Sequence, residues 1–177
     1  MTRYRLQRWR NRAQSFSHAM PADVADWLFD PASLTARLIR TCAGRFSVKV
    51  LSQGYGNARL SESRALQMQH REKALIREVH LLCDQQPLVY ARTVIPVSTL
   101  SGAQKHLAHL GDKPLGAVLF SDKTMQREEM QIACLNPSQV KLASRGNVDI
   151  WGRRSVFKLS AKPLLVSEYF LPDLFEN

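Results

Sequence analysis

Hydrophobic and polar residues alternate over five stretches of the chain, with the two-residue period of a half-buried β-strand. These stretches are 46–50, 75–82, 88–95, 151–160 and 164–171. The polar segment 83–86 separates the second stretch from the third, and residues 161–163 separate the last two. Each of these pairs therefore predicts a β-hairpin.

Before the first predicted strand the pattern has helical spacing instead. Residues 21–29 predict a short helix with Pro21 near its start. A second helix begins after Pro31, with Ser33 as its cap and Gly44 as its end. The apolar stripe of this second helix consists of Leu34, Leu38 and Ile39.

The remaining segments are less regular. A long loop is expected over 53–72. A helix from Ser101 or Gly102 to Gly111, with Leu107 and Leu110 facing inward, is followed by a short helix over 115–120. Residues 124–133 predict a strand but would also tolerate a helix, and residues 134–149 predict a loop. Strands joined by hairpins, with helices set between them, predict an α+β fold with a mainly antiparallel sheet.

The 177 residues suit one compact domain, and no repeat or Pro/Gly/Ser-rich linker divides them. The formal charge of +10 is uneven, because the first 20 residues hold five arginines and no acid. We therefore expect a basic N-terminal arm over 1–20 and a folded domain over 21–177. A solvated arm, a membrane-surface contact and a nucleic-acid contact all remain open for the arm.

Cys42, Cys83 and Cys134 are odd in number and isolated in sequence. This usage predicts free thiols in a reducing cytoplasm rather than a disulfide framework. The sequence has no apolar run of the roughly 18 to 20 residues that a membrane span requires. The start of the chain lacks the apolar region of a secretory signal. We therefore expect a cytoplasmic protein.

Two charged residues interrupt apolar faces of the predicted hairpin strands. Because side chains alternate across a strand, Arg77 and Glu168 each share a face with three apolar residues. These neighbours are Leu75, Val79 and Leu81 for Arg77, and Leu164, Val166 and Phe170 for Glu168. A charge buried without a partner is costly. Either the two form a structural ion pair between strands, or they face a cavity where the arginine binds a ligand carboxylate.

Other candidate sites are weak. His106 and His109 are three residues apart on a predicted helix, but no acidic residue completes a metal-binding set, so surface histidines are expected. The segment Gly54-Tyr55-Gly56 lacks the third glycine of a dinucleotide-binding loop. The sequence also lacks a P-loop and a nucleophile elbow. We therefore expect neither a metal nor an organic cofactor. The aromatic residues are scattered and form no platform on which bases could stack, so no nucleic-acid partner is expected.

Several sequence blocks, in a fixed order, resemble those of the chorismate pyruvate-lyase family of ubiquinone biosynthesis. The blocks are Ala-Arg-Thr-Val-Ile-Pro-Val-Ser-Thr-Leu-Ser-Gly at 91–102, Lys-Pro-Leu-Gly at 113–116, Trp-Gly-Arg-Arg-Ser at 151–155, Lys-Pro-Leu-Leu at 162–165 and Glu-Tyr-Phe-Leu-Pro at 168–172. The resemblance covers roughly residues 22 to 172. So many blocks in order are far more specific than one short motif.

The resemblance implies an enzyme that converts chorismate to 4-hydroxybenzoate and pyruvate, in a buried site under helical flaps. It implies that Arg77 holds the ring carboxylate and Glu168 the 4-hydroxyl, and that the backbone amides of Leu34 and Leu115 complete the grip. It implies a lyase without a cofactor, and we expect a monomer. The alternative is a non-catalytic module of the same fold that binds a small aromatic acid.

Three departures from the family pattern stand out. Leu34 occupies a position where methionine is familiar, Ala91 replaces a glycine, and residues 135–147 look like an insertion. An added methyl at Ala91 would alter product release. The leaving group of the implied reaction gains negative charge, so a second cationic contact is expected, and Arg153 or Arg154 is the candidate.

Overall fold

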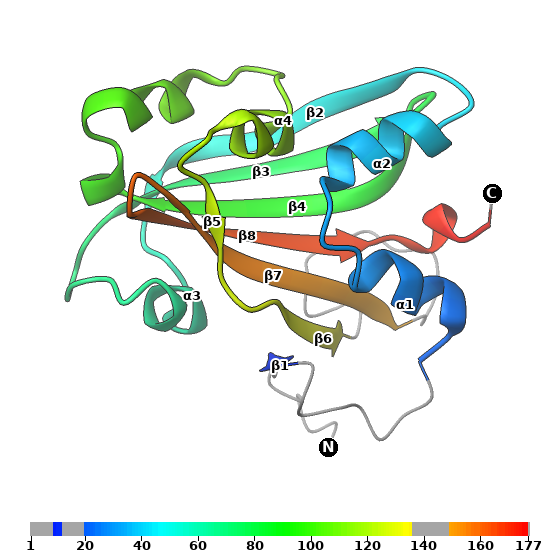
Figure 1. Ribbon diagram of the computed structural model, residues 1–177, viewed down its shortest axis with the longest axis horizontal. Coiled ribbons are helices and arrows are strands. Elements are labelled where there is room, and N and C mark those ends of the chain that lie inside the picture. Colours follow the sequence, from blue (N-terminus) through cyan, green and yellow to red (C-terminus); the bar gives the residue numbers. More distant parts are fainter. Residues whose placement is uncertain (1–8, 12–19, 136–148, 177) are drawn as a thin grey trace.

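The computed structural model describes residues 9–11, 20–135 and 149–176. In these residues one antiparallel sheet of eight strands has the order β1-β6-β7-β8-β4-β3-β2, and β5 pairs with β7. The strands are β1 Arg10–Asn11, β2 Phe46–Gly56, β3 Ala74–Cys83, β4 Gln86–Pro96, β5 Gln126–Arg127, β6 Gln131–Leu135, β7 Ile150–Leu159 and β8 Lys162–Phe170. The last hairpin, β7 with β8, lies in the middle of the sheet (Figure 1).

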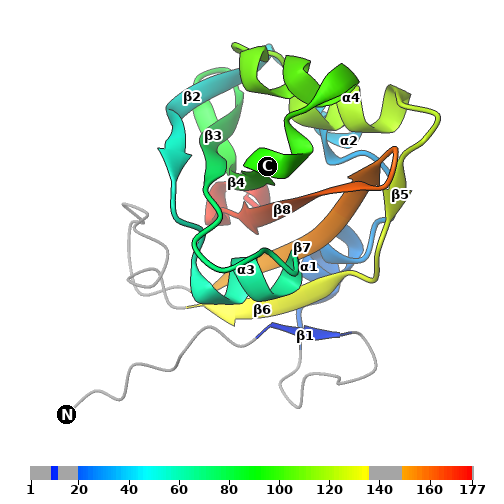
Figure 2. The same ribbon diagram turned by 90° about the vertical axis from the view of Figure 1, so that its left-hand side faces the viewer.

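Four α-helices accompany the sheet in the described residues: α1 Ala22–Leu28, α2 Leu34–Thr41, α3 Leu60–Ala65 and α4 Leu115–Ser121. In the same part of the chain, 3₁₀ segments cover Val97–Thr99, Gly102–His109 and Pro172–Leu174. Figure 2 shows α2 and α4 on one side of the central strands and α3 on the other. The predicted single α+β domain with a mainly antiparallel sheet is therefore confirmed.

Both predicted hairpins are confirmed. β3 pairs with β4, and β7 with β8, along nearly their full lengths. Their two-residue turns have positive φ angles, at Asp84 and Gln85 in the first and at Ser160 and Ala161 in the second. Turns of this kind match the twist of the paired strands and so set their register.

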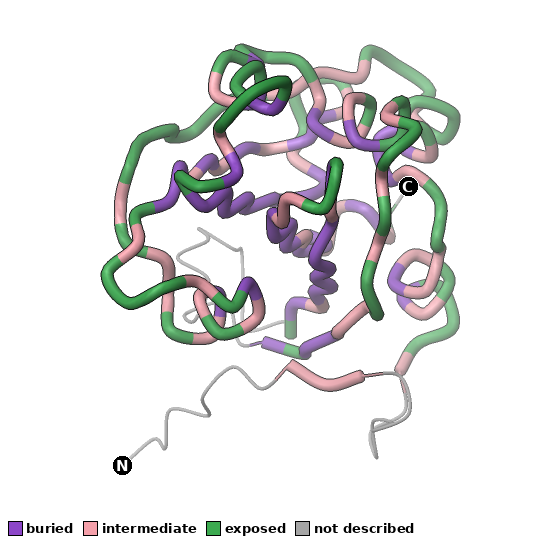
Figure 3. The backbone as a smooth tube through the Cα atoms, turned by 60° about the vertical axis from the view of Figure 1, so that its left-hand side comes forward, coloured by how far each residue is buried: buried purple, intermediate pink, exposed green. Residues whose placement is uncertain are grey.

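The sheet is covered on both faces, and its central strands are buried (Figure 3). On one face, α1 and α2 pack on β3 and β4 around Leu28, Leu38 and Val89. The same face continues under α4, where Leu119 and Leu164 are buried. The opposite face carries two further hydrophobic clusters. One consists of Tyr90, Ala133, Leu135, Ile150, Tyr169 and Leu171, and the other consists of Leu66, Ala74, Val94, Val156 and Leu165.

Three local predictions were wrong. The segment 53–72 is not a loop throughout, because β2 continues to Gly56 and α3 follows. β2 is an edge strand with mostly exposed side chains, so its backbone pairing with β3 decides its structure despite a polar sequence. The second helix ends at Thr41, before Gly44, and Ile39 is exposed rather than part of the buried stripe.

The prediction of free thiols is wrong for two of the three cysteines. Cys42 and Cys83 form a disulfide, with Cα atoms 5.7 Å apart, that joins the end of α2 to the end of β3. The two residues are 41 positions apart in sequence, and only the packing of α2 against the first hairpin brings them together. Cys134 is exposed on β6 and lies outside this disulfide.

Some expectations concern residues that are not described. These are the arginine-rich arm, except for Arg10 in β1, and the insertion expected over 135–147, except for Leu135 at the end of β6. Among the described residues, no helix combines the length and the apolar character that crossing a bilayer requires.

Candidate functional site

A cavity lies between the sheet and the helices α2 and α4. Its volume is about 50 Å³, enough for a few waters. Most of its wall is apolar, and the charged side chains on the wall are Arg77, Arg127, Arg153 and Glu168. Its uncharged lining includes Leu34, Thr35, Ala91, Thr93, Leu115, Gly116, Phe157 and Val166.

Arg77 reaches this cavity from β3 and is only 3% exposed. Its Nη1 donates a 3.0 Å hydrogen bond to Oε1 of Gln53, and its Nη2 donates a 3.4 Å bond to the carbonyl oxygen of Lys113. Burial lowers the pKa of Arg77, while the charge of Asp112 acts in the opposite direction. No ion pair of the described residues includes Arg77. Its guanidinium is therefore a buried cation suited to a ligand carboxylate.

Glu168 reaches the same cavity from β8. In the sheet it lies next to Ala91 of β4 on one side and Arg153 of β7 on the other. Its Oε2 accepts a 2.5 Å hydrogen bond from Nε of Arg153, and the two charges form an ion pair. None of the other described residues donates a hydrogen bond to the second carboxylate oxygen of Glu168, Oε1. One oxygen is thus fixed by the protein, and the other is available to a ligand.

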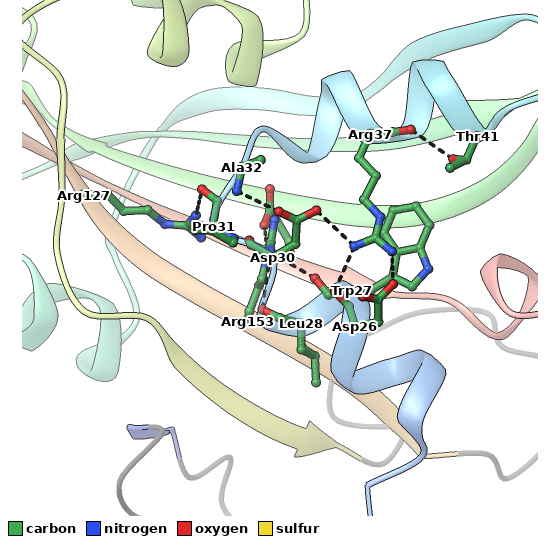
Figure 4. A network of polar contacts seen from close by, with 11 residues as sticks. Asp26, Trp27, Leu28, Asp30, Pro31, Ala32, Arg37, Thr41, Arg127 and Arg153 are labelled. Carbon is green, nitrogen blue, oxygen red and sulfur yellow. Dashed lines mark hydrogen bonds and ion pairs between the residues drawn. The ribbon is translucent and has the colours of Figure 1, made fainter.

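Arg153 connects this carboxylate to the end of α1. It is 1% exposed, and its Nη1 donates to the carbonyl oxygens of Trp27, Leu28 and Asp30 at 3.1, 3.4 and 2.7 Å (Figure 4). The last carbonyls of a helix lack intrahelical partners and attract cations. Arg153 therefore orients Glu168 while it holds the connection between α1 and α2 against the sheet.

A second arginine fixes α2 relative to α1. Arg37 forms ion pairs with Asp26 and Asp30, and its guanidinium stacks 3.8 Å from the ring centroid of Trp27 (Figure 4). Burial raises the pKa of Asp30, but the hydrogen bonds from Ala32 and Arg37 and the charges of Arg37 and Arg153 outweigh it, so the pKa lies below its ordinary value. These contacts hold the helix that covers the cavity.

The structure does not contain the structural ion pair that was the alternative interpretation of the two charges. Arg77 and Glu168 both line the cavity, but Glu168 is paired with Arg153 and Arg77 bonds only to neutral groups. Alternation along two strands placed both side chains on apolar faces, and both of these positions line one cavity. Their roles toward a ligand stay a prediction.

Leu34 and Leu115 are the first residues of α2 and α4, and both line the cavity. The N–H groups in a first helical turn have no intrahelical acceptor, so a ligand can take them up. The two helices approach closely here: a Cβ added at Gly116 would lie 2.7 Å from Oγ1 of Thr35. The two backbone N–H groups that are predicted to contact a ligand therefore lie at the roof of the cavity, where Gly116 allows α2 and α4 to approach each other closely.

Sequence reasoning missed Arg127 and misplaced Arg154. Arg127 lies on β5 and lines the cavity, whereas Arg154 points to the opposite face of the sheet. There its Nε donates to Gln131 at 2.8 Å and its guanidinium lies over the ring of Trp9. Alternation along β7 separates Arg153 from Arg154 once the strand is known. Because β5 has two residues, no periodic pattern could reveal Arg127.

The opposite face of β4 carries a buried polar network. Nε and Nη2 of Arg92 donate to the two carboxylate oxygens of Glu62 on α3, and Nη1 donates to Glu78 on β3. Tyr90 also donates to Glu78, at 2.6 Å. Burial and its hydrogen bond to Glu78 raise the pKa of Tyr90. This network fixes α3 on the sheet behind the cavity and does not reach the cavity itself.

The chain is similar to known proteins over most of its length. A family model described as chorismate lyase matches residues 7–177. A protein of Methylococcus capsulatus, named probable chorismate pyruvate-lyase, is 39% identical over 153 residues, which cover 84% of this chain and 94% of that one. Proteins of the same name from Azoarcus and Pseudomonas aeruginosa are 42% identical over 158 residues (84% of this chain, 83% of that one) and 38% identical over 166 residues (94% and 92%).

Solved structures share the fold at low sequence identity. The ligand-binding domain of a putative GntR-family transcriptional regulator from Bordetella bronchiseptica is 15% identical and aligns with a TM-score of 0.56, over 73% of this chain and 86% of that one. PhnF from Mycobacterium smegmatis is 12% identical, with a TM-score of 0.59, over 82% of this chain and 66% of that one. These likenesses concern the fold alone.

Proposed function

Since the chain belongs to the chorismate lyase family and is a lyase, we propose that it converts chorismate to 4-hydroxybenzoate and pyruvate. The observation that carries the proposal is the pair Arg77 and Glu168, which come from separate strands and line one cavity. We further propose that the 4-hydroxybenzoate supplies the ring of ubiquinone.

The cavity suits a ring that carries a carboxylate at one end and a hydroxyl at the other. Arg77 binds the ring carboxylate through its planar pair of N–H donors, and its burial strengthens this contact by excluding water. The backbone N–H groups of Leu34 and Leu115 add to the grip from the roof. Oε1 of Glu168 accepts the hydrogen bond of the 4-hydroxyl, since Oε2 is held by Arg153.

The reaction breaks the bond between ring C3 and the ether oxygen. The electron pair of that bond stays on the oxygen, which leaves as the enolate of pyruvate, and the proton at C4 is lost as the ring becomes aromatic. The enolate then takes up a proton to give pyruvate. Aromatisation favours these steps, so the residues act by positioning the ring, excluding water and stabilising charge. Glu168 either orients the 4-hydroxyl or accepts the proton.

One assay tests the proposal directly. Purified protein is mixed with chorismate, 4-hydroxybenzoate is followed by its ultraviolet absorbance, and pyruvate is measured in parallel with lactate dehydrogenase. Equal amounts of both products, formed much faster than in buffer, are expected. Arg77→Ala should abolish most of this rate. Tight binding of 4-hydroxybenzoate without any turnover would instead favour the non-catalytic aromatic-acid binding module and refute the lyase.

A further inference from the structure

Arg127 approaches the cavity from the side opposite to Arg77. Arg77 of β3 lies next to Thr93 of β4 in the sheet, and the same cross-strand row continues through Val166 of β8 to Ser155 of β7. Arg127, on β5 beyond β7, donates from its Nε to Oγ of Ser155 at 3.0 Å. The two arginines therefore mark the two ends of one row of residues across the cavity floor.

The hydrogen bonds and the ring contact of Arg127 orient its guanidinium without forming an ion pair. Besides the bond to Ser155, its Nη1 donates to the carbonyl oxygen of Pro31 at 3.1 Å (Figure 4), and the group lies 5.1 Å from the ring centroid of Phe157. All of these partners are neutral, and no ion pair of the described residues includes Arg127. Since arginine has five N–H donors, three remain for a ligand.

The charges on the cavity wall match a ligand with two negative charges. The wall carries three guanidinium groups and one carboxylate. Arg153 and Glu168 form an ion pair, which leaves Arg77 and Arg127 as the two cations of the wall without an ion pair. Asp112 acts on Arg77, and Glu168 and Asp30 act on Arg127, only through their charges. Arg77 is buried and Arg127 is half-buried. Because removing an unpaired cation from water is costly, a ligand that supplies the opposite charge is expected at both. 4-Hydroxybenzoate has a single carboxylate and matches only one of them.

We propose that Arg127 binds the carboxylate of the enolpyruvyl group of chorismate and stabilises the negative charge that this group gains as it leaves. The inference rests on the proposed function, because it assigns Arg127 to the second carboxylate of the same substrate. It replaces Arg153 and Arg154 in the expected role of second cationic contact. Arg153 is committed to Glu168 and to three backbone carbonyls, and Arg154 faces away from the cavity.

The test compares ligands that have one or two carboxylates. The variants are Arg127→Met, Arg127→Lys and the control Arg40→Met, which removes one positive charge from the exposed side of α2. For each, kcat and KM for chorismate are measured. The dissociation constants of 4-hydroxybenzoate and of 3-(carboxymethoxy)-4-hydroxybenzoate are measured by calorimetry. The second compound keeps both carboxylates on an aromatic ring and is not cleaved. Thermal melting verifies that each variant folds.

Arg127→Met should lower kcat/KM for chorismate by about 10²-fold or more, as expected for the loss of one donor to developing charge. Its affinity for the dicarboxylate should fall about tenfold or more, which is the effect of removing one charged contact, while its affinity for 4-hydroxybenzoate stays within about threefold. Arg127→Lys should recover part of both losses, because it keeps the charge without the planar fork. Arg40→Met should behave as the wild type.

Two results would overturn the inference. Equal losses of affinity for both ligands would mean that Arg127 only shapes the cavity, and unchanged kinetics would mean that it does not contact the substrate. Failure of the proposed function has a different outcome, since a wild-type protein that releases no pyruvate from chorismate refutes the lyase itself. Arg127-dependent binding of the dicarboxylate in that protein would still support a second carboxylate site.

Discussion

Reduction of the disulfide between Cys42 and Cys83 should destabilise the fold by a predictable amount. The bond closes a loop of 41 residues. In the chain-entropy model, a loop of this length removes about 13 cal/mol/K from the unfolded chain, or about 4 kcal/mol at 25 °C. For a chain of this size, each kcal/mol changes the melting temperature by about 2–4 °C. The reduced protein is therefore expected to melt about 8–16 °C lower.

The assay is guanidinium chloride and thermal unfolding, followed by circular dichroism with and without dithiothreitol. Thiol titration of the denatured protein should find two fewer thiols before reduction than after it. Cys42→Ser should match the reduced wild type and show no further response to the reductant. Cys134→Ser is the matched control, because it removes an exposed cysteine outside the disulfide, and it should keep the full response.

The same bond holds the end of α2, whose first turn covers the cavity through Leu34 and Thr35. Reduction should therefore also weaken the retention of 4-hydroxybenzoate, because the covering helix loses its attachment to β3. An unchanged melting midpoint in protein that thiol titration shows to be fully reduced would refute the reasoning. So would a purified, unreduced protein in which all three cysteines react.

Three further predictions concern the site and its support. If Glu168 accepts the proton, Glu168→Gln should lower kcat by about 10²-fold or more while the affinity for 4-hydroxybenzoate is unchanged; if Glu168 only orients the 4-hydroxyl, the affinity should fall instead. Gly116→Ala should cost about 1–3 kcal/mol of unfolding free energy and weaken ligand retention, since its Cβ meets the Thr35 hydroxyl; Gly54→Ala, where a Cβ meets nothing within 4 Å, is the control and should melt as the wild type. Burial raises the pKa of Glu78, but hydrogen bonds from tyrosine, serine and arginine side chains outweigh it and hold the pKa below 4.5. Its folded pKa is thus depressed, so its stabilising contribution is present above about pH 4.5 and lost as the pH falls through the folded pKa; acid melts should show this loss, and in Glu78→Gln it should be smaller.

Local patterns predicted much of the fold. The two hairpins follow from alternation over 75–95 and 151–171, and the cap of α2 follows from Ser33, whose hydroxyl accepts the N–H of Ala36 at 3.3 Å. The same alternation placed Arg77 and Glu168 on apolar faces. Such inferences succeed where a periodic element is long enough for burial to select each second residue.

The remaining features depend on contacts between distant segments. α3 is polar and short, and its Glu62 accepts a hydrogen bond from Arg92, which lies 30 residues further along the chain. Arg127 lies on a strand of two residues, so only the pairing of β5 with β7 directs it to the cavity.

The sequence by itself determined the two hairpins and the two charges that face inward, because each depends on neighbours within a few residues. Only the tertiary structure decided which charges are neutralised. Glu168 is paired with Arg153 through adjacent strands, whereas Arg77 and Arg127 form no ion pair with any described residue and lie at opposite sides of the cavity. The physical reason is that electrostatic pairing depends on distance in space, which the order of residues along the chain does not contain.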